Sequence, residues 1–232
     1  MVTELGIAQF VDMAETVTRL DRAAVYGKPL ETTLGEKLFK SLAEALMVRP
    51  EQIADLQSMH PRTAAQLLLR AKCPGIAQEG LPMEGRLLLA AQDRGLPILA
   101  LESGEQQYGA IPKITSKIWI AYVANAVRFA ERADCSLAMK LMQNQIMQAA
   151  DTGDATALLD AARAGYAELD YEEFDRHFIG SRNQHLAANA IAILGKKRFP
   201  LFAIGAGHLH GKDGVLDRLK AAGFEWAVLV VK

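Results

Sequence analysis

Apolar residues recur every three or four positions along most of the chain, and this spacing predicts amphipathic helices. Glycine, proline or a capping residue stands between most of these stretches. We therefore predict about ten helices, over approximately residues 5–25, 34–47, 50–59, 62–72, 83–94, 114–150 (two helices that meet near Asp134), 155–166, 171–178, 181–194 and 214–222.

Three short, continuous apolar runs predict buried strands at residues 97–101, 201–204 and 226–231. The many helices and few strands indicate an α/β protein with a small sheet. A length of 232 residues suits one large domain or two small ones.

Several residues mark where the predicted helices begin and end. Thr33 and Ser181 are expected to cap the helices that follow them. Pro50 suits the first position of a helix, where its missing N–H costs nothing. Gly95 and Gly195 are expected to end helices as the glycine just past the last turn.

Composition and charge exclude some classes of protein. The net charge is −1 with acids and bases mixed, which argues against a nucleic-acid-binding protein. No apolar run approaches the length of a transmembrane segment, and the opening residues do not resemble a signal peptide, so the compartment stays undetermined. Cys73 and Cys135 form either one disulfide or two buried thiols. The size of the chain favours thiols, because a large core needs no cross-link.

The loop after the predicted strand at 201–204 carries the densest group of chemically useful residues. His208 and His210 lie there among Gly205, Gly207 and Gly211. Ligands in open α/β sheets bind beyond the carboxyl ends of strands. Histidine binds metals and acts as a general base, and glycine amides can bind an anion, so Gly205 and Gly207 are candidate ligand-binding residues. The alternative, an ordinary turn, stays open.

Two further polar residues occupy notable positions. Glu102 follows the predicted strand at 97–101, where a carboxylate can bind metal or move protons. Capping of the next helix is the alternative for Glu102, although Glu105 suits that role too. Arg182 stands near a predicted helix start, where the helix dipole disfavours a cation. It is therefore either a surface arginine or one that pairs with a carboxylate or a substrate anion.

Three stretches resemble signature blocks of one family, in the same order and at comparable spacing. They are LALESGEQQ at 99–107, GSRN at 180–183 and FAIGAGHLHG at 202–211, and LKAAGF at 219–224 also fits. Together they make the chain similar to the TraB/GumN family, which includes the Tiki proteases. The resemblance extends over residues 3–231, which favours a single domain over residues 1–232.

The resemblance implies a fold, a reaction and a set of site residues. The implied fold is α/β, with a small central sheet surrounded by helices and related to erythromycin-esterase-like proteins. Tiki members are metal-dependent peptidases with two Gly-x-x-His motifs and acidic residues. The resemblance therefore implies Glu102, Arg182 and His208 as catalytic residues, with His208 and Glu4 as ligands of a divalent metal (Mn, Co or Zn).

The chain departs from the family in having only one Gly-x-x-His, at Gly205–His208. Its opening residues 2–5 resemble the end of the family's second strand, so the first strand and helix are expected to be missing, with Glu4 as the surviving carboxylate. A sheet that lacks a strand exposes unpaired backbone groups. We therefore expect a homodimer or strand exchange between chains.

Three functions stay open. The first is a metal-dependent, peptidase-like hydrolase with an incomplete active site, in which metal-bound water attacks a peptide or ester carbonyl. Glu102 or Glu4 would then be the base, and Arg182 would stabilise the oxyanion. The second is a non-catalytic binding or scaffold protein in a plasmid-conjugation or envelope context. The third is a metal-free esterase-like hydrolase that uses His208 as its base.

Overall fold

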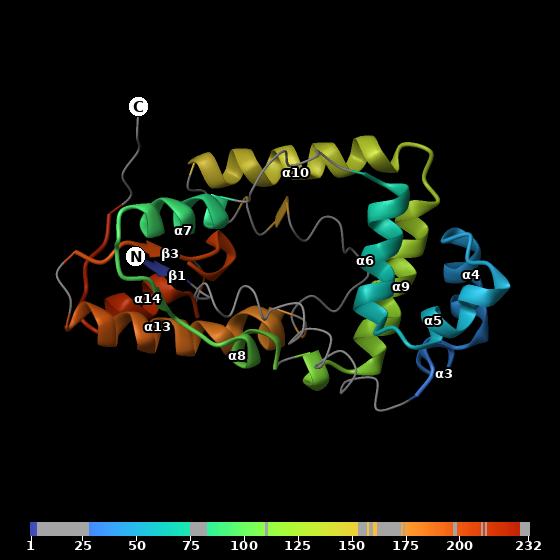
Figure 1. The fold of residues 1–232 in the computed structure, drawn as a ribbon, viewed down its shortest axis with the longest axis horizontal. Coiled ribbons are helices and arrows are strands. Elements are labelled where there is room, and N and C mark those ends of the chain that lie inside the picture. The colour runs from blue at the N-terminus through green and yellow to red at the C-terminus, as the bar shows by residue number, and fades with distance from the viewer. Residues whose placement is uncertain are drawn as a thin grey trace.

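A computed structural model describes residues 1–3, 28–74, 83–109, 111–152, 157, 160–161, 173, 175–196, 199–209, 211 and 213–227. Helices dominate it, and the strands form one small parallel sheet (Figure 1). The predicted α/β class, a small sheet among many helices, is confirmed.

The sheet consists of β1 (Val2–Thr3), β2 (Leu99–Ala100) and β3 (Phe202–Ala203), in the order β2-β1-β3. Val2 lies opposite both Leu99 and Phe202, and all pairings are parallel. The runs at 97–101 and 201–204 thus contain strands, as predicted. Residues 226–227 form no strand, and the rest of the predicted run at 226–231 lies outside the described residues.

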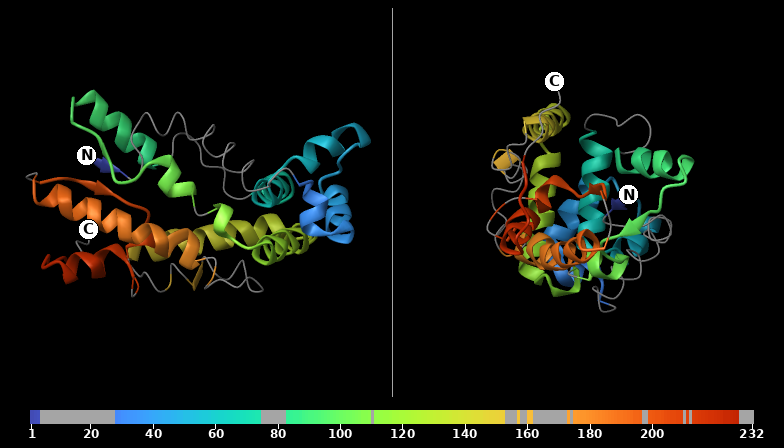
Figure 2. Two further views of the ribbon diagram at one scale, coloured as in Figure 1. Left: turned by 90° about the horizontal axis from the view of Figure 1, so that it is seen from below. Right: turned by 90° about the vertical axis from the view of Figure 1, so that its left-hand side faces the viewer.

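Helices cover both faces of the sheet. Helix α7 (Met83–Asp93) lies on one face, and α13 (Ser181–Leu194) and α14 (Val215–Ala221) lie on the other (Figures 1 and 2). The face of α13 that meets the sheet carries Leu186, Ala187 and Ala190, whose small or compact side chains allow close packing. The buried residues of this sheet cluster are Val2, Leu101, Leu186, Ala187, Ala190 and Val215.

A second apolar cluster, the helical cluster, lies almost entirely on helices. Apart from Ile114, its buried residues belong to α3 (Leu30–Leu34), α4 (Glu36–Ala45), α5 (Ile53–Gln57), α6 (Pro61–Lys72), η2 (Ile111–Lys113) and α9 (Ser116–Ala130), and the short helix η1 (Pro50–Gln52) directly precedes α5. Trp119 of α9 lies in its centre, edge-on to His60 with 4.7 Å between ring centroids. The apolar stripe predicted for this helix therefore packs as core.

The helix boundaries agree with the sequence at some points and differ at others. Pro50 opens η1, Gly95 has a φ of +61° after α7, and Gly195 follows α13, all as predicted. The cap predicted at Thr33 is wrong, because α3 ends and α4 begins at Gly35, whose φ of +79° suits glycine. The predicted helix at 5–25, most of that at 155–166 and three residues of that at 171–178 lie outside the described residues.

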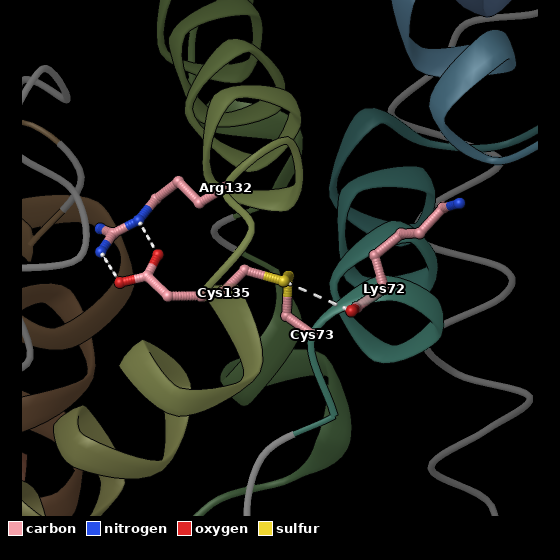
Figure 3. The surroundings of a disulfide bond; sticks show 5 residues. Lys72, Cys73, Arg132 and Cys135 are labelled. Carbon is pink, nitrogen blue, oxygen red and sulfur yellow. Dashed lines mark hydrogen bonds and ion pairs between the residues drawn. A yellow bond between two sulfur atoms is a disulfide. The ribbon is translucent and has the colours of Figure 1, made fainter.

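Cys73 and Cys135 form a disulfide, so the expectation of two thiols is wrong (Figure 3). Cys73 directly follows α6, and Cys135 begins α10 (Cys135–Thr152). Their Cα atoms lie 5.2 Å apart, within the range that a disulfide requires. Most of the buried apolar residues that the structure describes lie in two clusters and not in one large core, so the length of the chain overstated how much one core could stabilise it.

The molecule is elongated in the plane of Figure 1, with the sheet towards one end and the helical cluster at the other. Helix α10 runs along one side between these two parts. Within the described residues, no helix combines the length and the apolar character that a membrane crossing requires.

Candidate functional site

The carboxyl ends of the three strands lie at one edge of the sheet, because all three are parallel. Thr3 ends β1, Glu102 follows β2 by two residues, and His208 follows β3 by five. Each of these residues is at most 5% exposed. The order β2-β1-β3 sends the chain to opposite sides of β1, and such a switch point is where open α/β sheets bind ligands.

Glu102 forms a buried ion pair with Arg182. The Nε of Arg182 lies 3.1 Å from both carboxylate oxygens of Glu102, and its Nη2 donates to Oε1. The Glu102 side chain has no exposed surface, and that of Arg182 is 5% exposed. The capping role considered for Glu102 belongs to its neighbour instead. Ser103 and Gln106 form a reciprocal capping box at the start of α8 (Gly104–Tyr108).

Arg182 does not stand at the start of a helix. A π-helical turn over Arg176–Gly180 leads directly into α13, so the backbone is already helical before Ser181. Ser181 is therefore not the predicted cap, and its hydroxyl donates to the His177 carbonyl at 2.6 Å. A helix start that would disfavour a cation is therefore absent at Arg182, and of the two alternatives left open for this residue the surface arginine is excluded. Arg182 pairs with a carboxylate.

His208 is held by Asn183, the residue after Arg182. The Nδ1 of His208 lies 2.7 Å from Oδ1 of Asn183, and both side chains are buried. The amide oxygen can only accept, so Nδ1 carries the proton and Nε2 is the basic nitrogen of the neutral ring. Helix α13 thus provides a partner for each of the two site residues. Arg182 binds Glu102, which follows β2, and Asn183 binds His208, which follows β3.

Helix α13 also holds the backbone beside Glu102. The side-chain amide of Asn189 donates to the Leu101 carbonyl at 2.6 Å. Asn189 lies seven residues, two helical turns, after Arg182, which places both on the same side of α13. Asn183 and Asn189 were not predicted as site residues from the sequence. The seven-residue spacing from Arg182 is a pattern from which Asn189 could have been found, whereas Asn183 has no such signal in the sequence.

The glycine-rich loop provides less than the sequence suggested. Gly205 precedes the short 3-10 turn Ala206–His208, and its carbonyl accepts the His208 N–H at 2.9 Å. A Cβ on Gly207 would meet no atom within 4 Å, so packing does not require glycine there. Gly211, with a φ of +97°, does require the freedom of glycine. His210 lies outside the described residues.

The described residues do not fit a metal centre. Arg182 engages both carboxylate oxygens of Glu102, and Asn183 holds one nitrogen of His208. Among the residues that the structure describes, no three histidine, cysteine, aspartate or glutamate side chains are placed to hold a metal ion. The predicted ligand Glu4 lies outside these residues.

Comparison with known families assigns the chain. The model of the TraB/PrgY/gumN family matches residues 1–227. The chain belongs to this family. The resemblance seen in the sequence is thereby confirmed, and the match spans both the sheet and the helical cluster. No curated protein and no solved structure matches the chain.

In this TraB/PrgY/gumN member, Glu102, Arg182 and His208 lie at the same edge of the sheet. The Glu102–Arg182 ion pair joins residues 80 positions apart in the chain, and the hydrogen bond between Asn183 and His208 joins residues 25 positions apart.

Proposed function

We propose that this TraB/PrgY/gumN member is a hydrolase whose general base is His208. The hydrogen bond between His208 and Asn183 carries the proposal. A base that a third group holds in one tautomer is the arrangement found in hydrolases with histidine bases. The π-helical turn just before Arg182 adds support, because π turns are frequent at functional sites.

The proposed reaction is attack of water on a peptide or ester carbonyl. The Nε2 of His208 takes a proton from the water as the new C–O bond forms, and later returns it to the leaving amine or alcohol. Arg182 is the cation of the cluster, and we assign it the stabilisation of the oxyanion. Glu102 orients the guanidinium through both of its oxygens.

The proposed mechanism contains no divalent metal, because the described residues do not fit one. The experiment nevertheless measures whether activity depends on a metal. Activity on a panel of fluorogenic peptides and aryl esters should be measured with a chelator and with added Mn, Co or Zn. Activity that persists in the chelator supports the metal-free reaction. Activity that depends on metal supports the original expectation, in which His208 and Glu4 are ligands.

Variants on α13 and its neighbouring loop test the assignment of the base. His208→Gln should lower kcat by about 10²–10⁴-fold, which is the usual contribution of a general base. Asn183→Ala should cause a smaller loss in kcat with little change in KM, because it frees the ring without removing it. His185→Gln is the control, since His185 lies exposed on the same helix. Full activity of His208→Gln would refute the proposal.

The second candidate is a binding or scaffold protein without catalysis, in the conjugation or envelope context of the family. The burial of the cluster favours it, because Glu102, Arg182, Asn183 and His208 are each at most 5% exposed. Under this proposal the cluster only stabilises the edge of the sheet. This candidate function predicts that the His208→Gln variant is less stable than the parent. It also predicts that neither protein hydrolyses any substrate of the panel.

A further inference from the structure

An apolar groove lies at the edge of the sheet opposite the candidate site. It has a volume of about 390 Å³ and runs between α7 and the residues that precede the three strands. Leu87 and Ala90 of α7 line one side, and Pro97 and Leu201 lie among the residues of the other. Among the described residues that line the groove, Arg94 is the one with a charged side chain. The groove is therefore an apolar surface with a charged rim.

An exposed aromatic ring stands at the rim of this groove. Phe199 lines the groove, yet 93% of the residue is exposed to solvent. Its backbone has a φ of +56°, in the left-handed region that bulky residues rarely adopt. Leu201, two residues on, is 59% exposed. A large apolar projection thus stands directly beside an apolar hollow, which is typical of a surface that is covered by another molecule.

This face is complementary to itself. A two-fold symmetric dimer uses the same patch on both subunits, so it requires a projection and a hollow on one surface, and Phe199 and the groove provide them. Arg94, which lines the groove, directly follows Asp93 in the chain, and these two opposite charges are both exposed. Neither forms an ion pair with another described residue. Two copies can therefore place each aspartate near the other copy's arginine.

We propose that this face is the interface of a homodimer in which the Phe199 ring of each copy enters the groove of the other. In such a dimer each Phe199 ring is buried by the other copy. One residue type thus contributes buried apolar area twice, so the dimer depends strongly on Phe199. The candidate hydrolase site lies at the opposite edge of the sheet. The interface therefore does not cover the edge that carries that site, and it is independent of the proposed reaction.

Sedimentation velocity on the full chain tests the proposal. From about 1 µM to 1 mM, a range that includes weak interfaces, the parent should shift towards twice its mass of 25.3 kDa. Phe199→Asn should raise the dissociation constant roughly a hundredfold or more, because two buried rings are lost per dimer. Asparagine tolerates positive φ better than most residues, so this variant should fold like the parent. Phe199→Tyr should retain the dimer.

Two further variants separate this interface from any other apolar surface. Ala90→Lys places a charge in the groove from an exposed position on α7, and it should weaken the dimer as Phe199→Asn does. Leu141→Asn alters a residue of α10 that is 54% exposed, and it should leave the dimer unchanged. A parent that stays monomeric at every concentration would overturn the proposal. So would a dimer that Phe199→Asn and Ala90→Lys leave intact.

Discussion

The buried pair of Glu102 and Arg182 lends itself to a double-mutant cycle. The variants are Arg182→Met, Glu102→Leu and the two combined, each of which replaces a charged group by an apolar side chain of similar length or bulk. The quantity compared is the free energy of unfolding. The cycle measures how far the contribution of each charge to the free energy of unfolding depends on the presence of the other charge.

The expected magnitudes follow from the burial of the pair. Glu102 has no exposed side-chain surface, so Arg182→Met leaves its carboxylate without its cation and out of contact with water. Removing one partner of a buried ion pair costs about 3–5 kcal/mol, and we expect a loss of this size from either single variant. The double variant contains neither charge, and such replacements are often neutral. It should therefore be more stable than either single variant by about 3 kcal/mol or more.

Urea unfolding followed by circular dichroism measures these differences. The matched control is Arg132→Met, because Arg132 binds Asp134 through the same two nitrogens, Nε and Nη2, each at 2.9 Å. That pair is 50% and 56% exposed, so its loss should cost far less than the loss of the buried pair. If Arg182→Met costs no more than the control, the carboxylate of Glu102 is not desolvated and the reasoning is refuted. A stable but inactive double variant would place the pair in the reaction.

Three other predictions follow from separate parts of the structure. Replacing Cys73 and Cys135 by serine should lower the free energy of unfolding by about 4 kcal/mol, because the disulfide spans a sequence separation of 62. Reductant should shift the parent's urea midpoint in the same direction, and coincident curves would contradict the bond. Leu68→Ala should cost about 2–5 kcal/mol, since Leu68 is fully buried in the helical cluster, whereas Leu67→Ala, at a site 44% exposed, should cost much less. Arg132 lowers the pKa of Asp134, mainly through its hydrogen bond to the carboxylate and to a smaller extent through its charge. The small stabilisation from this exposed group should be present above the ordinary carboxyl pKa and fade as the pH falls through the lowered value. An NMR titration of the carboxylate with a midpoint no lower in the parent than in Arg132→Met would contradict it.

The sequence anticipated the elements that depend on local pattern. The apolar runs before Glu102 and before His208 contain β2 and β3, and the helix that ends at Leu194 was predicted with its observed end. The prediction failed at Ser181, which looks like a cap by residue type. A π-helical turn precedes it and continues the helix, and that turn has no simple pattern of residue types.

The candidate site was predicted only in part. Glu102 and His208 were found because each follows an apolar run, which is a local feature. The choice between a paired and a surface Arg182 could not be made, because its partner lies 80 residues away in the chain. Asn183 was passed over as a site residue, because an asparagine in the first turn of a helix is unremarkable until the histidine that it holds is known.

By itself, the sequence determined the family and the α/β class, since these follow from motifs and from the spacing of apolar residues along the chain. The central strand β1 was not among the strands that the apolar runs predicted, because only two residues of it are described as a strand. Only the tertiary structure decided which distant groups meet. The parallel sheet brings Glu102 and His208 to the same edge on either side of β1, and α13 crosses that edge with a partner for each. The disulfide and the groove beside Phe199 were decided in the same way, because both depend on how separate segments pack and not on the residues adjacent in sequence.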